Sequence, residues 1–148
     1  MAFRFSLETL LRFRQSVERS QEILLQAANE RVMLASFEIE NLERFLEYRR
    51  TVRSGELSRG AFASELQFEI LGDDALRRRA QVLNQQLTGL QALRDQQLEK
   101  FRKARAEREA VESIRDRQLI AYHEDQKRRA QRNLDDLFLM RREFIRRG

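Results

Sequence analysis

The sequence predicts an all-α fold, a long antiparallel two-stranded coiled-coil hairpin with a short helix near its turn. Composition is the first observation behind this prediction: the 148 residues include no proline, 36% are charged, and the mean hydropathy of -0.69 does not suit a compact globular core. The second is that apolar residues recur at helical spacing, which disordered chains lack. The third is that two long stretches with this spacing flank a region that carries paired glycines.

The first long helix is expected over about residues 6–52. Ser6 is a suitable N-cap, Glu8 complements the helix dipole, and Phe5 with Leu10 would form a hydrophobic staple. A narrow stripe of apolar residues, mostly three and four positions apart, then predicts a coiled-coil seam, which Arg14 and Gln21 interrupt. Its members are Phe3, Leu7, Leu10, Val17, Leu24, Leu25, Ala28, Val32, Ala35, Ile39, Leu42 and Leu46.

A turn is expected over residues 53–60, because Gly55 and Gly60 lie there and the apolar spacing is lost. A short amphipathic helix over 61–71 would follow. Gly72 is then interpreted as the C-cap of this short helix, and Asp73 as the N-cap of the next one.

The second long helix is expected over 73–147, because no strong helix breaker follows Asp73 and the 3-4 spacing returns. Arg108 interrupts its stripe. Two amphipathic helices joined by a turn bury their stripes most readily against each other, so the whole chain, 1–148, would form one elongated hairpin whose second helix extends past the first. The predicted stripe consists of Leu76, Ala80, Leu83, Leu87, Leu90, Leu93, Phe101, Ala104, Val111, Ile114, Tyr122, Ala130, Leu134 and Leu137.

The sequence does not indicate an enzyme. It has no cysteine and no glycine-rich phosphate loop, and a histidine-based triad or metal site would depend on His123 alone. We interpret His123 as a surface residue, with a partner contact as the less favoured alternative. No catalytic residue, cofactor or metal is therefore predicted.

Membrane insertion is not predicted either, because no run of about 18 apolar residues occurs and charges interrupt the N-terminal stretch. The expected location is the cytoplasm, with at most peripheral membrane association. Four basic clusters could contact phosphates, but acidic residues alternate with them, which favours solvated helix faces. Nucleic-acid binding is not expected, although a basic rod that binds nucleic acid or anionic membrane stays the alternative function. The clusters are Arg77-Arg78-Arg79, Lys127-Arg128-Arg129, Arg141-Arg142 and Arg146-Arg147.

Motifs at both ends resemble those of the flagellar export protein family FliJ. The opening follows the family pattern of Phe, basic, Phe, x, Leu-Glu, x, Leu-Leu and basic residues, here Phe3-Arg4-Phe5-Ser6-Leu7-Glu8-Thr9-Leu10-Leu11-Arg12-Phe13-Arg14. Near the C-terminus the similar stretches are Asp116-Arg117-Gln118, the residues from Tyr122 to Arg132, and Asn133-Leu134-Asp135-Asp136-Leu137. The middle is similar in length and in its turn at Gly60. The stalk proteins of type III secretion injectisomes are similar as well.

The resemblance implies a protein of the flagellar type III export apparatus rather than an enzyme. Family members form an antiparallel coiled coil that resembles the central stalk of rotary ATPases and enters the hexameric ring of the export ATPase FliI. They promote assembly of the ring and link it to the export gate FlhA. They also handle export chaperones. These partners would hold the protein at the cytoplasmic side of the inner membrane.

The resemblance also implies two contact surfaces. The surface that faces the ATPase ring would comprise Leu7, Leu10, Leu11, Leu134, Leu137 and Phe138. The surface that faces the gate would comprise Leu42, Phe45, Leu76 and Leu83, of which Phe45 is one step off the seam and suits an exposed anchor. Gly72, Arg49 and Arg79 depart from the aromatic or small residues that the family carries at the gate-facing positions. Each leucine could equally serve only the seam.

Overall fold

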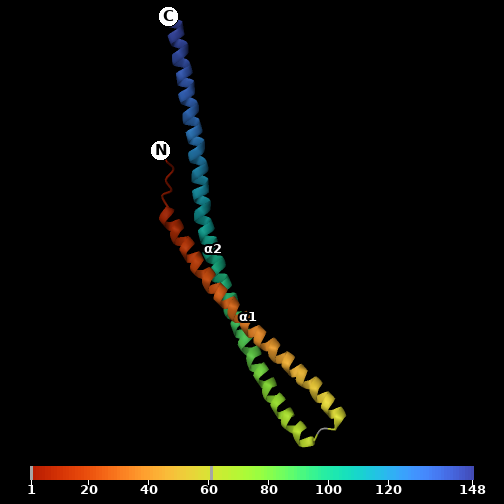
Figure 1. Ribbon diagram of the computed structural model, residues 1–148. Coiled ribbons are helices and arrows are strands. Elements are labelled where there is room, and N and C mark those ends of the chain that lie inside the picture. The colour runs from red at the N-terminus through yellow and green to blue at the C-terminus, as the bar shows by residue number, and fades with distance from the viewer. Residues whose placement is uncertain (1, 61) are drawn as a thin grey trace. The chain divides into compact units, whose positions relative to one another are not determined.

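The computed structural model describes residues 2–60 and 62–148 of the chain, and within them it contains two α-helices and no strand (Figure 1). Helix α1 spans Glu8–Arg59 and helix α2 spans Ala63–Arg147. The two helices run in opposite directions and pack against each other. The predicted all-α helical hairpin is confirmed.

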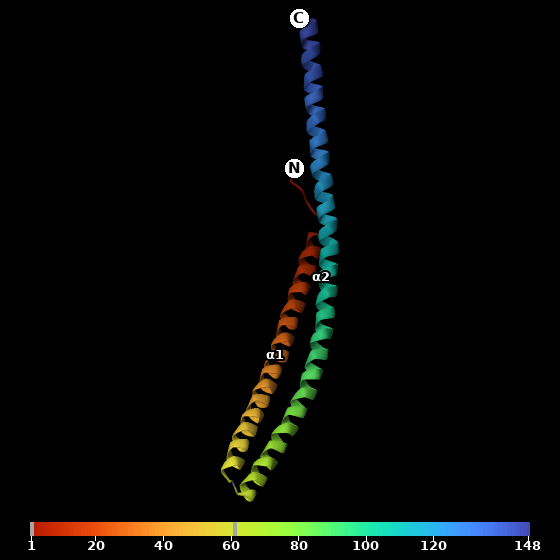
Figure 2. The same ribbon diagram turned by 90° about the vertical axis from the view of Figure 1, so that its right-hand side faces the viewer.

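The described residues form two compact units, and both helices contribute to each. The terminal unit combines the chain up to Glu18 with Lys103–Gly148, and the loop unit is Arg19–Arg102. Within each unit a segment of α1 lies beside an antiparallel segment of α2 (Figures 1 and 2). The prediction of one domain over 1–148 stays a prediction.

The predicted turn over 53–60 is wrong for all but its last residue. Helix α1 continues to Arg59, and Gly60 ends it with a positive φ of 86° that residues with a Cβ rarely adopt. The helix is extended because Arg53 faces α2, where it pairs with Asp73. Gly55 therefore lies inside a helix, where it costs about 1 kcal/mol relative to alanine.

The predicted short helix over 61–71 is also wrong as a separate element. Ala61 lies outside the described residues, and the rest of the segment belongs to α2, which begins at Ala63 and passes through Gly72 without a break. Asp73 does not cap a helix, because its side chain is turned into the seam and is 3% exposed. The ion pairs that Asp73 makes with α1 replace the capping role that the sequence suggested.

The N-terminal segment packs onto α2 before α1 begins. The first hydrogen bond of α1 joins the Leu11 amide to the Leu7 carbonyl oxygen at 2.9 Å, so the helix starts after Ser6. Phe5 and Leu11 are buried against Val111, and Phe3 packs on this cluster. The predicted staple between Phe5 and Leu10 is wrong, because the extended segment carries Phe5 onto α2 and leaves Leu10 37% exposed.

The seam of α1 keeps an unbroken 3-4 spacing, and polar residues belong to it. Every residue of this series is buried or half-buried: Leu11, Arg14, Glu18, Gln21, Leu25, Ala28, Val32, Ala35, Ile39, Leu42, Leu46, Arg49, Arg53 and Glu56. The prediction that Arg14 and Gln21 interrupt the seam is therefore wrong. The apolar residues assigned in their place, Leu7, Leu10 and Leu24, are exposed.

The seam of α2 also keeps the 3-4 spacing, from Leu66 to Arg115, and includes polar residues. Leu83, Ala104 and Val111 are buried as predicted, whereas Leu93 is 57% exposed and Arg94 takes its place. Arg108 also belongs to the seam, which corrects its assignment as an interruption. All members are buried or half-buried: Leu66, Glu69, Asp73, Leu76, Ala80, Leu83, Leu87, Leu90, Arg94, Gln97, Phe101, Ala104, Arg108, Val111 and Arg115.

Polar seam residues are matched across the two helices. In the loop unit the Gln97 amide donates to the Gln21 side-chain oxygen at 2.6 Å. In the terminal unit Arg108 Nε lies 2.6 Å from Glu18 Oε2, and Arg14 pairs with Glu107. The hydrogen bond to Glu18 is the main cause that raises the pKa of Arg108 above its ordinary value. Long polar side chains can thus occupy seam positions because their stems pack while their ends are paired.

Candidate binding surfaces

The last part of α2 has an apolar face that no other part of the described chain covers. Every residue of 127–148 is exposed. We call this segment the overhang; it is the blue end of α2 in Figures 1 and 2, which extends without a neighbouring helix. Its large apolar side chains are 55% to 81% exposed: Leu134, Leu137, Phe138, Leu139, Met140, Phe144 and Ile145. Exposed apolar side chains in such number indicate a surface for a partner.

Most of these apolar side chains share one side of the helix. Leu134 and Phe138 are four residues apart, and Leu137, Phe144 and Ile145 follow at spacings that bring helical side chains to one face. Phe138 and Ile145, with Arg141 and Arg142, line a shallow cavity of about 360 Å³. The sequence-based set missed Phe144 and Ile145, although the same helical spacing would have included them.

The overhang is strongly basic. Its 22 residues include eight arginines or lysines and three acidic residues, a net charge of +5 that equals the excess of the whole chain. Arg128 and Arg129 pair with Glu124 and Asp125 one turn earlier. The overhang therefore offers an apolar face with basic flanks, which suits a surface that is apolar at its centre and acidic at its rim.

The α1 residues predicted for the ring contact differ in exposure. Leu7 and Leu10 are each 37% exposed, whereas Leu11 is 1% exposed and lies in the core cluster with Phe5 and Val111. Leu11 is thus placed to support that surface rather than to contact a partner. The ring of Tyr122 contacts that of Phe3, at the start of the chain. Leu134 lies 12 residues after Tyr122, which is about 18 Å farther along the helix. The α1 and overhang residues therefore do not gather into one patch.

The residues predicted to face the gate are mostly seam residues. Leu42 and Leu76 are half-buried, and Leu83 is 3% exposed. Phe45 is 47% exposed, and the Arg49 guanidinium carbon lies 5.8 Å from its ring centroid. In the loop unit Phe45, Tyr48, Arg49, Val52 and Glu69 line a shallow cavity of about 250 Å³. Phe45 is the member of the predicted set that a partner can reach.

A buried ion network stands beside this surface in the loop unit. Arg49 Nε lies 2.9 Å from Asp73 Oδ1, and Arg53 donates a hydrogen bond to Asp73 Oδ2. Within the described part of the chain Oδ1 accepts no aligned hydrogen bond, so the Arg49 contact is electrostatic. The hydrogen bond to Asp73 raises the pKa of Arg53 above its ordinary value. At this level of the seam, ion pairs rather than apolar contacts hold α1 and α2 together.

The comparison with family models agrees with these features. The model of the flagellar FliJ protein matches residues 3–148. The chain belongs to the FliJ family. It is therefore a component of the flagellar protein export apparatus, and this family is structural and regulatory and is not known for catalysis. No curated protein and no solved structure matches the chain significantly.

The departures of this chain from the FliJ gate-facing pattern are connected. A Cβ atom at Gly72 would lie 3.6 Å from Arg49 Nη2, so Arg49 passes directly beside the Gly72 backbone to reach Asp73. Arg79 pairs with Glu38 of α1, the closest atoms being 3.4 Å apart. Where the resemblance implied aromatic or small residues, Arg49 and Arg79 form ion pairs between the two helices.

Possible metal ligands do not cluster in the described part of this FliJ-family chain. Groups of three or more histidine, cysteine or acidic side chains that could hold a metal do not occur there. His123 is exposed, and its ring centroid lies 5.7 Å from that of Tyr122. No described helix is long and apolar enough to cross a membrane.

Proposed function

We propose that the chain is the central stalk of the export ATPase ring, where it promotes assembly of the FliI hexamer and links the ring to the export gate FlhA. The observation that carries this proposal is the uncovered apolar face of the overhang. The overhang is a single helix about 30 Å long, narrow enough to enter a ring pore. Its basic flanks suit acidic residues on the ATPase subunits.

The ring contact is proposed to be centred on Leu134, Leu137 and Phe138, with Phe144 extending it. Leu7 and Leu10 would form a second, smaller contact at the start of α1, with Leu11 supporting them from the core. Large apolar side chains at the centre of an interface carry most of its binding free energy. Their exposure of 61% to 81% in the free chain leaves this area available for burial.

The gate contact is proposed to be centred on Phe45. Leu42, Leu76 and Leu83 lie deeper and would shape the surface from below. The ion network at Arg49 and Asp73 keeps the two helices in register next to Phe45, so this surface has a fixed shape. We propose further that the protein handles export chaperones, and that it is cytoplasmic with peripheral attachment to the inner membrane through these partners.

ATP hydrolysis by the cognate export ATPase tests the ring contact. Adding the wild-type chain should raise the hydrolysis rate and the fraction of hexamers, measured by phosphate release and by sedimentation. The double variant Leu134→Asp/Phe138→Asp should lose both effects, because charges would be buried in the apolar contact. Arg132→Ala/Glu143→Ala on the same segment is the matched control and should keep most of the stimulation.

Equal stimulation by the Asp variant and the control would overturn the proposed ring contact. If the wild type has no effect on the ATPase but binds DNA or anionic vesicles with steep salt dependence, the alternative of a basic rod takes its place.

Binding to the FlhA cytoplasmic domain tests the gate contact separately. Phe45→Ala should weaken binding about tenfold or more, as for a central aromatic anchor. Phe37→Ala provides the control, because Phe37 is on the same helix, is exposed at 59% compared with 47% for Phe45, and is outside the predicted set. Equal loss in both variants would argue against a contact centred on Phe45.

A further inference from the structure

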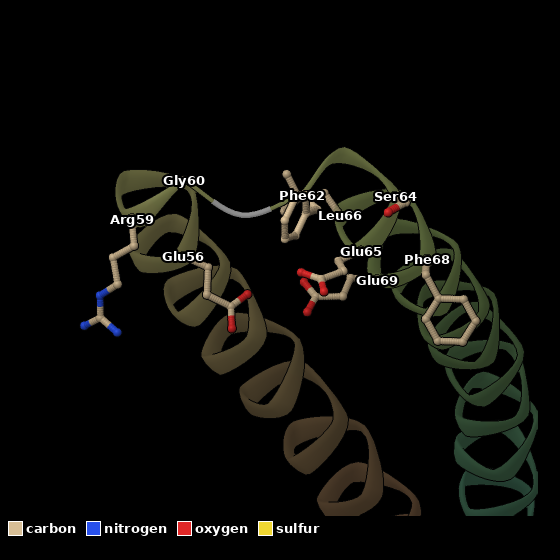
Figure 3. A pocket seen from close by; sticks show the side chains of 9 residues that line it. All are labelled: Glu56, Arg59, Gly60, Phe62, Ser64, Glu65, Leu66, Phe68 and Glu69. Atoms are coloured by element: carbon tan, nitrogen blue, oxygen red, sulfur yellow. The ribbon is translucent and has the colours of Figure 1, made fainter.

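The tip of the hairpin contains a cavity that neither proposed contact uses. It has a volume of about 710 Å³ and lies entirely within the loop unit, between the end of α1 and the start of α2. Figure 3 shows Glu56 from α1 and Glu65 and Glu69 from α2 directed toward the space between the two helices, with Phe62 beside them. Arg59 is directed away from this space.

Two of these carboxylates lack a cationic partner. Glu69 pairs with Arg53, at 3.5 Å between Oε2 and Nε. Glu56 and Glu65, by contrast, form no ion pair or side-chain hydrogen bond with any residue in 2–60 or 62–148. Most other acidic side chains around the loop unit are matched by an arginine, so this pair leaves an uncompensated negative charge at the mouth of a cavity.

The charge of the tip opposes that of the rest of the chain. Residues 54–74 contain five acidic side chains, Glu56, Glu65, Glu69, Asp73 and Asp74, and one basic side chain, Arg59, for a net charge of -4. The whole chain has 29 basic and 24 acidic residues, so the remainder carries +9. Arginines just outside this range pair with Glu69, Asp73 and Asp74, so the uncompensated negative charge at the tip is that of Glu56 and Glu65.

Two aromatic side chains also line this cavity, Phe62 beside the carboxylates and Phe68 on the side of α2 that faces away from α1 (Figure 3). Phe62 is 75% exposed and Phe68 is 80% exposed, although both are large apolar rings. The face of an aromatic ring attracts a guanidinium or ammonium group, and its body packs on the aliphatic stem of arginine or lysine. Carboxylates beside exposed rings therefore provide both parts of a site for a basic side chain with an apolar neighbour.

We propose that the tip binds a basic, apolar-flanked segment of another protein, with one arginine or lysine seated between Glu56 and Glu65 and its stem against Phe62. Phe68 would receive the adjacent apolar side chain. Charge complementarity selects this occupant, because an acidic or purely apolar segment would leave both carboxylates unpaired. None of these residues belongs to the proposed ring or gate contact, so the inference is independent of the proposed function.

Fluorescence anisotropy with the full-length chain and labelled peptides tests the proposal. The probe is a 14-residue peptide that alternates arginine pairs with leucine pairs, and the control peptide has glutamine in place of every arginine. The arginine peptide should bind at least tenfold more tightly than the glutamine peptide at about 50 mM salt, and this preference should fall at about 200 mM because the contact is ionic.

Matched variants locate the binding. Glu56→Gln/Glu65→Gln keeps the side-chain size and should weaken binding of the arginine peptide at least about tenfold, because both charges that would pair with the bound basic side chain are lost. Phe62→Ala/Phe68→Ala should weaken it by a similar factor. Glu30→Gln/Glu143→Gln removes two exposed carboxylates elsewhere and should leave the affinity unchanged. Circular dichroism should show the same helix content in all of them, because five of the six positions are exposed and Glu56→Gln keeps the size of a half-buried side chain.

Three results would overturn the proposal. The first is undetectable binding of the arginine peptide to the wild type. The second is equal weakening by the tip carboxylate variant and the Glu30/Glu143 control, which would mean diffuse attraction. The third is self-association of the wild type, seen by sedimentation without peptide, that Glu56→Gln/Glu65→Gln abolishes; the occupant would then be the basic overhang of a second copy.

Discussion

Helix α2 contains two regions with similar apolar spacing and opposite surroundings. From Leu66 to Arg115 it packs against α1, and every seam residue is at least half-buried, charged side chains included. Over 127–147 it has no partner in the described chain, and even Phe144 is 81% exposed. The comparison shows that the spacing of apolar residues defines a stripe but does not determine whether the chain itself covers that stripe. The uncovered stripe is the one available for another protein.

The two regions also use charge differently. In the paired region Asp73 is 3% exposed and joins two arginines of α1, and Arg108 joins Glu18. At the start of the overhang, by contrast, Arg129 pairs with Asp125 at 2.9 Å, an exposed neighbour one turn earlier on the same helix. Ion pairs between seam residues of the two helices therefore hold the hairpin in register. Exposed ion pairs between residues one turn apart on the same helix contribute little to stability.

Truncating one apolar side chain in each region should give the largest difference in the free energy of unfolding. Leu11→Ala should lower the free energy of unfolding by about 3 kcal/mol, because it leaves a cavity in a cluster where Leu11 is 1% exposed. Leu137→Ala should change it by less than about 0.5 kcal/mol, because the side chain is already 62% exposed. Urea denaturation followed by circular dichroism measures both. Equal losses would mean that the overhang is covered in solution.

Removing a buried carboxylate should lower stability more than removing an exposed one, by a smaller margin than for the apolar side chains. Asp73→Ala should cost about 2 kcal/mol, since it removes the buried acceptor of the network and leaves Arg49 without its counter-charge, while Arg53 keeps only Glu69. The neighbouring change Asp74→Ala removes an exposed pair with Arg77 and should cost less than about 0.5 kcal/mol. Thermal unfolding of the two variants side by side gives the comparison. A loss for Asp74 as large as that for Asp73 would contradict the role assigned to burial.

Gln21 and Gln97, which are hydrogen-bonded to each other across the seam, should affect stability in opposite ways when one or both are replaced. Gln21→Leu alone removes the 2.6 Å hydrogen bond, leaves the Gln97 amide with only a 3.4 Å bond to the backbone oxygen of residue 21, and should destabilise the chain by about 1 kcal/mol. Replacing both with leucine should recover this loss, because no unpaired amide is left and an apolar pair fits a seam position. A double-mutant cycle by urea denaturation measures the coupling. Additive effects would show that the two amides do not interact in solution.

Two glycines should give the smallest effects. Gly72→Ala should raise stability by about 0.5–1 kcal/mol, because it improves helix propensity and the new Cβ meets Arg49 at an ordinary contact distance of 3.6 Å. Gly60→Ala should lower stability by about 1 kcal/mol, because the positive φ of Gly60 disfavours a side chain. Thermal midpoints that move in the same direction for both would contradict the assignment of Gly72 to a helix interior and Gly60 to its end.

The sequence predicted the fold class and the middle of the seam, and it failed where polar residues take seam positions. Ala28, Val32, Ala35, Ile39, Leu42 and Leu46 were assigned correctly because they are apolar. Near the ends of α1, apolar spacing led to Leu10 and Leu24, while Arg14, Gln21 and Arg53 occupy the seam. These polar residues pack because their partners, Glu107, Gln97 and Asp73, stand opposite them on the other helix, 20 to 93 positions away, and periodicity within one helix carries no information about such residues.

The candidate surfaces were predicted in part for the same reason. Hydrophobic spacing identified Leu134, Leu137 and Phe138, and it placed Phe45 one step off the seam, where the structure leaves it 47% exposed while Leu83 is buried. The tip cavity was not predicted, because the turn was assigned to residues 53–60. The structure instead brings Glu56 and Glu65 together across Gly60.

Hydrogen exchange on the overhang tests the central claim most directly. Amides of residues 127–147 should exchange faster in the free chain than those of the paired seam, because this single helix has no tertiary packing in the described structure. On addition of the cognate export ATPase they should become protected, while exchange near Asp73 stays the same. A stable complex in which the overhang gains no protection would contradict the account.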